Sequence, residues 1–219
     1  MRSLLQHALA VALLATAGDG PAGTARPGSP AVPAPPPRVA PAGTVLFVDD
    51  FRSLAAWRAD RDGVWSLKAG VLQGRLPSRK QERSFLYAGS EDWHDYALDL
   101  DLCQLRGVDK GAAVGVQGTH GVGVDLRGGE YQDVLLYRQE VPLGRAKAAN
   151  ADGAWHHLRV EMPGARYRVL VDGALVLDRR EARGAARRGG IALAAYTGGL
   201  GECTVLYANV VVTKLARSR

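Results

Sequence analysis

Apolar and polar residues alternate one by one between residues 155 and 178, where glycine-containing turns interrupt the pattern twice. The alternation in Trp155–Met162 is typical of a β-strand with one buried face. Tyr167–Val171 repeats it, and Asp172-Gly173 then supplies the two residues that a tight type I′ hairpin favours before Ala174–Leu177 runs back. This stretch therefore predicts three antiparallel strands.

The chain between residues 95 and 147 predicts further strands, whose two faces differ. One predicted face is apolar and belongs to the core: Ala112, Val114 and Val116, then Val122, Val124 and Leu126. The other face carries Gly111, Ala113, Gly115 and Gln117, then Gly121, Gly123, Asp125 and Arg127. Glycine inside a strand marks a bulge, a bend or close approach by a ligand. We therefore expect an open trough with polar groups at its ends.

The next strand, Tyr131–Arg138, places Tyr131, Asp133 and Tyr137 on the same outer face as the trough. Aromatic rings cover the C–H face of a sugar, and carboxylates accept hydrogen bonds from its hydroxyl groups. The candidate ligand-binding residues are Gln117, Asp125, Arg127, Tyr131, Gln132, Asp133 and Tyr137. The alternative is that glycine only eases curvature and tyrosine fills cross-strand neighbours.

Several short motifs, in this order and spacing, resemble the concanavalin A-like and laminin G-like jelly rolls. They are FVDDF at 47–51, W and GVL at 65 and 70–72, WHDY at 93–96, WHHLRV and YRVLVDG from 155 to 173, GIAL at 190–193 and VLYANVVV at 205–212. The resemblance implies an all-β fold, a two-sheet antiparallel β-sandwich over residues 44–216. Within it, the chain is most similar to bacterial 3-keto-disaccharide hydrolase-type domains, formerly called family sixteen glycoside hydrolase-like, and also resembles non-catalytic lectin-like domains.

Catalytic residues are only partly matched. The Glu-x-Asp-x-x-Glu strand motif of family sixteen glucanases, whose paired carboxylates a retaining mechanism needs, is absent. The 3-keto-disaccharide hydrolase resemblance implies an Arg at the end of one concave strand and Glu-x-Gln on its neighbour. Glu130-Tyr131-Gln132 copies the second feature, but Gln117 replaces the Arg. A second alignment puts Gly123 at the Glu and Asp125 at the Gln, so Glu130 and Asp125 are the candidate catalytic residues.

The N-terminal part predicts export. Residues 1–17 combine an early Arg2, an apolar run and the small residues Ala15-Thr16-Ala17, the layout of a signal peptide, and the run is too short to span a bilayer. Residues 18–43 hold eight of the 11 prolines and predict a disordered linker. Residues 44–216 then suffice for one domain, which we expect to be secreted or held in the periplasm or cell envelope, without a transmembrane segment and as a monomer.

Cys103 and Cys203 are the two cysteines of the chain. We expect the strand Tyr96–Arg106 to pair antiparallel with the last strand, Cys203–Thr213, which brings Cys103 near residues 203–205. Export favours a disulfide between them. Strand alternation turns one cysteine inward and the other outward unless a bulge intervenes, for example near Asn209, so two buried free thiols are the alternative.

The formal net charge of +6 is spread along the chain, except for a cluster of Arg179, Arg180, Arg183, Arg187 and Arg188. Such a cluster suits an anionic polysaccharide, or it is simply a solvated loop. Nucleic acid is not an expected partner, because no aromatic residues or binding motif accompany the arginines.

No cofactor or metal site is expected from the remaining residues. The superfamily often binds structural calcium near the position of Asp49-Asp50, but Ala208 replaces one of its oxygen ligands, so calcium is disfavoured. Asp92, His94 and His120 are possible acid, base or metal groups without a metal-ligand spacing, and His156 and His157 should point to opposite faces of one strand. Trp57, Trp65 and Trp155 should serve packing, and Trp93 is left open.

Three functions remain. The first is a secreted domain that binds a glycan on the concave sheet. The second is a hydrolase or lyase of glycosides, including 3-keto-glycosides. The third is an envelope interaction domain without catalysis. The orientation of Glu130 distinguishes the first two, since a turn position exposed to solvent favours binding over catalysis.

Overall fold

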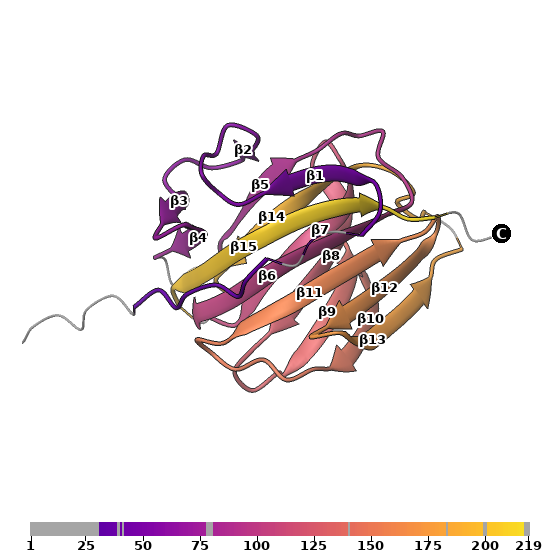
Figure 1. Ribbon diagram of the computed structural model, residues 1–219. Helices are drawn as coiled ribbons and strands as arrows, with labels where there is room; N and C mark the ends of the chain where they lie inside the picture. Colours follow the sequence, from indigo (N-terminus) through magenta and orange to yellow (C-terminus); the bar gives the residue numbers. More distant parts are fainter. Residues whose placement is uncertain are drawn as a thin grey trace, which may run out of the picture. The chain divides into compact units, whose positions relative to one another are not determined.

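The computed structural model describes residues 31–38, 40, 42–77, 81–139, 141–182, 184–198 and 201–216. The predicted signal peptide and most of the predicted linker lie outside these ranges. The described residues form strands and turns and no helix, so none of them makes a helix that could cross a membrane (Figure 1). The strands are β1 Val45–Asp49, β2 Arg58–Ala59, β3 Trp65–Lys68, β4 Val71–Leu76, β5 Arg83–Ala88, β6 Tyr96–Arg106, β7 Asp109–Gln117, β8 His120–Arg127, β9 Asp133–Arg138, β10 Val141–Lys147, β11 Trp155–Met162, β12 Arg166–Val171, β13 Ala174–Arg180, β14 Gly190–Tyr196 and β15 Cys203–Lys214.

The strands form two antiparallel sheets that pack face to face. The eight-stranded sheet has the order β13-β12-β11-β6-β15-β4-β3, with β1 also paired to β15, and the seven-stranded sheet has the order β10-β9-β8-β7-β14-β5-β2. Figure 1 shows the long strands β15, β6 and β11 in front of β14, β7 and β8. The expected all-β, two-sheet jelly-roll sandwich is confirmed.

The core lies between the sheets and is built from the alternate residues that the sequence predicts. Leu158, Val160 and Met162 of β11 are fully buried, and Val122, Val124 and Leu126 of β8 face them from the other sheet. Trp57 and Trp65 belong to the same cluster, and Trp93 packs against it, so these three indoles serve packing.

The predicted hairpin after β12 is confirmed. Asp172 and Gly173 have φ values of +50° and +82°, the two positive values of a type I′ turn, and Val171 pairs directly with Ala174. Strands β6 and β15 also pair antiparallel as expected.

The face of Val116 differs from the prediction, because β7 contains a β-bulge. Gly115 has φ +62°, and the register of β7 shifts between Val114 and Gln117 against β8. The extra residue reverses the alternation, so Val116 packs on the outer face with Tyr87 and Ala192 and not in the core.

Two buried tyrosines connect the sheets through their hydroxyl groups. Tyr96 of β6 accepts a hydrogen bond from the Gly115 amide at 2.7 Å and donates to the Gly190 carbonyl at 2.8 Å. Tyr207 of β15 reaches Gly111, donating to its carbonyl at 2.7 Å. Both therefore fix the backbone of β7 from the opposite sheet.

The predicted disulfide is not formed, and both cysteines are free and buried. Cys103 pairs with Leu206, three residues from Cys203, which lies beside Leu76 of β4. The predicted bulge does occur near Asn209, but it lies beyond this pairing and leaves the two side chains on opposite faces of the sheet. A disulfide needs Cα atoms within about 7 Å of each other, which this register prevents.

Candidate functional site

A cleft of about 340 Å³ opens on the outer face of the seven-stranded sheet. Strands β5, β7, β8, β9 and β14 all contribute to it. The charged and aromatic residues that line it are Arg83, Asp109, Asp125, Arg127, Tyr131, Tyr137 and Tyr196, and Gln81 and Gln139 line it as well. Four of the predicted ligand-binding residues therefore converge in one cavity, namely Asp125, Arg127, Tyr131 and Tyr137. We call this cavity the cleft.

Gly111 and Gly123 lie beneath the cleft, and side chains of the protein cover both of them. The Tyr137 ring lies over Gly123, where an added Cβ atom would stand 2.6 Å from the tyrosine Oη. The Asp125 carboxyl group lies over Gly111 in the same way, with Oδ1 at 2.7 Å from the corresponding Cβ position. The expected open trough is thus wrong in this respect, because the two glycines make room for side chains of the protein itself.

Two carboxyl groups lie near each other in the cleft, and both have a raised pKa. Burial raises the pKa of Asp125 to about 7, and the charge of Asp109 adds to the shift. Burial likewise raises the pKa of Asp109 to about 6, against the opposing effect of Arg127 and Arg83. Asp125 also accepts a hydrogen bond from Tyr137 Oη at 3.3 Å. Near neutral pH the pair therefore holds a proton that a solvated pair would have lost.

Arginines stacked on tyrosines flank these carboxyl groups on two sides. The Arg127 guanidinium lies 4.3 Å from the centre of the Tyr131 ring, and that of Arg83 lies 4.5 Å from the Tyr196 ring. Stacking holds each guanidinium flat against its tyrosine ring. The cleft thus combines aromatic surface, fixed cations and carboxyl groups.

Asp133, another predicted ligand-binding residue, is buried and binds Arg127 of the cleft. Its carboxylate is fully buried and receives hydrogen bonds from Arg127 Nε at 2.8 Å and Nη2 at 2.9 Å, and it also pairs with Arg145. Burial alone would raise the pKa of Asp133, but the hydrogen bonds from the two arginines lower it overall. Asp133 therefore positions Arg127 and is closed to a ligand.

The other three predicted residues do not line the cleft. Gln117 is exposed at the β7–β8 turn, where it pairs with His120. Glu130 is exposed in the turn between β8 and β9. Gln132 bonds the backbone of Gly129 and Asn150 and so fastens that turn. Of the expected catalytic pair, Asp125 lines the cleft and Glu130 does not.

Three of the charged and aromatic residues of the cleft escaped the sequence analysis, namely Asp109, Arg83 and Tyr196. Asp109 could have been found by extending the alternation of β7 back from Gly111, since residues 109 and 111 share a face. Arg83 and Tyr196 begin and end strands whose pairing, at Tyr196↔Arg83, only the fold reveals.

The remaining candidates do not join the cleft. His94 lies 3.1 Å from the Asp95 carboxylate, and His120 is exposed at a hairpin. Asp49 accepts hydrogen bonds from the Phe51 amide and from Trp57 Nε1, both at 2.6 Å. In the described part of the chain, His, Cys, Asp and Glu form no group of three or more that could hold a metal. The other acid and base candidate, Asp92, is exposed.

The described residues of the predicted arginine cluster are exposed to solvent. Arg179 and Arg180 are exposed on β13, Arg187 and Arg188 on the following loop, and Arg183 lies outside the described residues.

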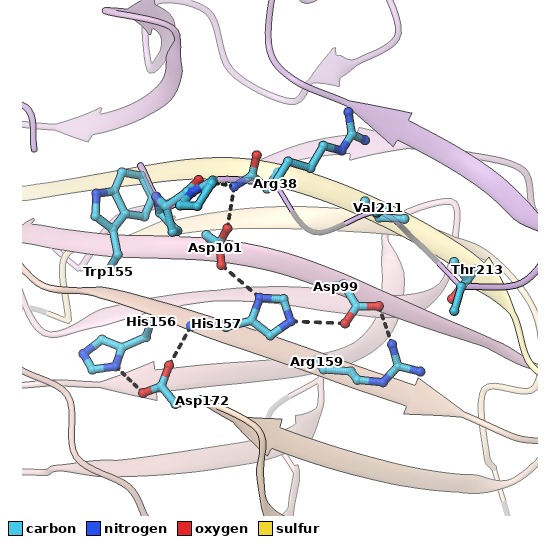
Figure 2. Close-up of a pocket in the computed structure, with 15 residues that line it drawn as sticks. Arg38, Asp99, Asp101, Trp155, His156, His157, Arg159, Asp172, Val211 and Thr213 are labelled. Carbon is cyan, nitrogen blue, oxygen red and sulfur yellow. Dashed lines mark hydrogen bonds and ion pairs between the residues drawn. The ribbon is translucent and has the colours of Figure 1, made fainter. Parts of the chain in front are cut away.

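A second polar cluster occupies the outer face of the eight-stranded sheet, beside a cavity of about 560 Å³ (Figure 2). His157 bridges two carboxylates, with Nδ1 at 2.9 Å from Asp101 and Nε2 at 3.2 Å from Asp99. These hydrogen bonds raise the pKa of His157 to about 9. His156 faces the opposite side of β11, as predicted, and bonds Asp172 at 2.8 Å.

Comparison with known proteins gives a family and a set of similar folds. A family model described as the 3-keto-alpha-glucoside-1,2-lyase-like domain matches residues 43–213. No curated protein matches the sequence of this chain.

The similar solved structures are distant in sequence and show the fold. Carbohydrate-binding module CBM66 from Bacillus subtilis is 18% identical with a TM-score of 0.62, over 73% of this chain and 96% of that one. A B. subtilis protein of unknown function with a galectin-like fold is 10% identical with a TM-score of 0.64, over 80% and 98%. A putative glycosyl hydrolase from Parabacteroides distasonis is 17% identical with a TM-score of 0.51, over 73% and 99%.

Proposed function

This chain belongs to the family of 3-keto-alpha-glucoside-1,2-lyase-like domains, and from that membership we propose that it binds a carbohydrate in the cleft of the seven-stranded sheet. The observation that carries the proposal is the pair of arginine–tyrosine stacks, Arg127 on Tyr131 and Arg83 on Tyr196, on either side of carboxyl groups. A pyranose ring needs both an aromatic surface and charged hydrogen-bonding partners at once.

Binding is preferred over catalysis because the catalytic pattern of the resembling hydrolases is missing from the cleft. The alignment that places their Glu on β8 puts it at Gly123, and the ring of Tyr137 fills the space that a side chain there would need. Glu130, the other candidate, lies in an exposed turn. The solved carbohydrate-binding module with the same fold agrees with a binding role.

The binding proposal is tested with a glycan panel that contains neutral glucosides, their 3-keto derivatives and anionic polysaccharides. We expect Tyr137→Ala and Asp125→Ala each to weaken retention of the full chain at least about tenfold, the loss of about 1.4 kcal/mol of binding free energy. His120→Ala, at an exposed hairpin away from the cleft, is the matched control and should bind as the unaltered protein does. Equal retention in all three variants would rule out the cleft as the binding site.

A second candidate is elimination on a 3-keto-glycoside, which the two carboxyl groups of raised pKa favour. One carboxylate would take the proton from C2, which the neighbouring ketone acidifies, and the electron pair would form a C1=C2 double bond. The C1–oxygen bond would break, and the leaving alcohol would accept a proton from the second carboxyl group. Asp125 and Asp109 are the residues that would carry these roles.

Mass spectrometry of 3-keto-glucosides incubated with the full chain tests this reaction. Release of the alcohol together with an unsaturated keto sugar, lost in Asp125→Asn, would establish the elimination. Retention of the sugar with no product would leave the protein as a binding domain.

Export is part of the proposal, with residues 1–17 as the signal peptide and the sandwich displayed outside the cytoplasm. N-terminal sequencing of the protein from the culture medium or envelope tests it. A mature chain that begins near Gly18 is the expected result, and an intact Met1 in that fraction would contradict it.

A further inference from the structure

Residues 31–37 form an extended segment whose exposure repeats with a period of three. Ala31, Ala34 and Pro37 are exposed, while Val32, Pro33, Pro35 and Pro36 are half-buried. Proline fixes φ near −65° and restricts the preceding residue to the extended region, so a segment this rich in proline favours polyproline II. That helix has three residues per turn, which explains the period. One side of the helix therefore faces the protein.

Two side-chain donors of the eight-stranded sheet bind carbonyl groups of this segment. Trp155 Nε1 donates to the Pro33 carbonyl at 3.3 Å, and Asn209 Nδ2 donates to the Pro36 carbonyl at 2.9 Å. Pro33 and Pro36 are three residues apart, one polyproline II turn of about 9.3 Å, so their carbonyls project to the same side. This helix makes no internal hydrogen bonds, and its carbonyls are free to accept from a partner.

An apolar patch beside these donors receives the side chain of Val32. The patch consists of Val71, Cys103, Leu206 and Ala208 on the outer face of the sheet, with Leu105 and Trp155 at its margin. Four apolar residues on an outer face would otherwise contact water. The segment covers them, and the path of the chain before β1 across β15 and β6 is visible in Figure 1.

Asn209 is held in place for this contact. It has φ +55° within the β-bulge that separates Ala208 from Val211 in the pairing of β15 with β6. The bulge turns its amide outward, where Nδ2 also donates to Asp101 Oδ2 at 2.6 Å. Asp101 is fixed in turn by His157, as Figure 2 shows. Both protons of the Asn209 amide are thus used, one to hold its position and one to bind the segment.

We propose that this outer face is a binding site for a polyproline II helix and that its occupant is residues 31–38 of the same chain. The site donates hydrogen bonds to the carbonyl groups of Pro33 and Pro36 and packs against the side chain of Val32. It is separate from the cleft, which lies on the other sheet, and it does not depend on the sugar that the cleft binds. Its effect is to fasten the chain to the sandwich ahead of β1.

The test uses the indole N–H of Trp155 in the full chain, followed by nuclear magnetic resonance. In a variant with Pro33, Pro35, Pro36 and Pro37 replaced by serine, we expect this proton to exchange with solvent at least about tenfold faster. The indoles of Trp65, bonded to Ser84, and of Trp57, bonded to Asp49, report whether the variant is folded and should be unchanged.

A synthetic peptide with the sequence of residues 31–38, added to the variant with these four serines, should restore the slow exchange of the Trp155 indole proton. Adding Asn209→Gly to that variant keeps the positive φ but removes one donor, and should weaken binding of the peptide by about two- to twelvefold. Equal Trp155 exchange with and without the prolines would overturn the proposal, as would a peptide without effect. Protection of Trp155 that increases with protein concentration would overturn it too, because the occupant would then come from a second copy.

Discussion

The ring of Tyr137 lies over Gly123, on the neighbouring strand, at the place where any other residue would carry its Cβ atom. Strand β8 lines the cleft, and it has glycine at position 123 because a side chain there would overlap the Tyr137 ring. Tyr137 is held flat against β8 and directs its hydroxyl at Asp125. Burial raises the pKa of Tyr137, so the phenol remains a donor.

Gly123→Ala is therefore expected to push Tyr137 out of its position. The added methyl group would overlap the ring, which costs about 1–3 kcal/mol of stability and weakens sugar retention by the cleft. Thermal unfolding and the glycan panel measure the two effects. Gly144→Ala on β10, where the added atom would stand 3.4 Å from Leu177, is the matched control and should change stability little. A Gly123→Ala protein as stable as that control would contradict the packing described above.

The stability of the protein should fall as the pH rises from about 4 to 7, between the unfolded and folded pKa values of Asp125. The pKa of Asp125, raised by burial to about 7, means that the folded state binds a proton which the unfolded state has already released at that pH. This contribution to stability is therefore complete below about pH 4, where both states hold the proton, and is lost progressively as the pH rises to the folded pKa of about 7. Denaturant unfolding across this range should show a smaller fall in Asp125→Asn. Asp62→Asn, at an exposed loop position, should retain the full fall, and an unaltered slope in Asp125→Asn would contradict the assignment.

The contribution of His157 to stability also falls as the pH rises, but over a higher pH range. Its folded pKa is raised to about 9 by hydrogen bonds to Asp101 and Asp99, so its contribution to stability is complete below about pH 6.5 and is lost as the pH rises through about 9. Unfolding at pH 6 and pH 10 should show that His157→Gln destabilises the protein at the lower pH and has little effect at the higher one. His120→Gln should behave like the unaltered protein at both. Equal destabilisation by His157→Gln at both values would mean that packing, not charge, is the contribution of this ring.

Both thiols should be free and unreactive in the folded protein. Burial raises the pKa of Cys103 to about 11 and that of Cys203 to about 12, so neither is a thiolate at neutral pH. A thiol reagent should label neither cysteine before unfolding and both afterwards, without a reductant. Loss of two mass units from the intact protein, as a disulfide produces, would be the contrary result.

Local alternation was enough to predict most strands, because each half-buried strand repeats its own pattern. Residues 155–178 contain three strands and a turn whose geometry Asp172 and Gly173 already determine. The face of Val116 could not be predicted in this way. The glycines of β7 indicate a bulge or a bend, but they do not show where the extra residue lies. The bulge at Gly115 is defined only against the partner strands β8 and β14.

The cleft was only half predicted for a similar reason. Asp125, Arg127 and Tyr137 lie on consecutive strands, so one meander brings them together. Arg83 and Tyr196 enter from β5 and β14, distant in sequence, and their approach depends on the order of strands in the sheet. Glu130 matched a motif, but the structure places it in a turn, where the alternation of a strand does not apply.

The hydroxyl groups of Tyr96 and Tyr207 have a mechanical consequence. Apolar side chains resist separation of two packed sheets, but they oppose sliding of one sheet over the other only weakly, because their contacts have no direction. Hydrogen bonds do have direction. The Tyr96 hydroxyl accepts one from the Gly115 amide and donates one to the Gly190 carbonyl, and the Tyr207 hydroxyl accepts one from the Gly111 amide and has the Gly111 and Ala194 carbonyls within donating distance. These bonds would break early in such a slide. A force that slides one sheet over the other would therefore meet resistance first at these four backbone positions, and the sheet that carries the cleft is held to the opposite layer against shear.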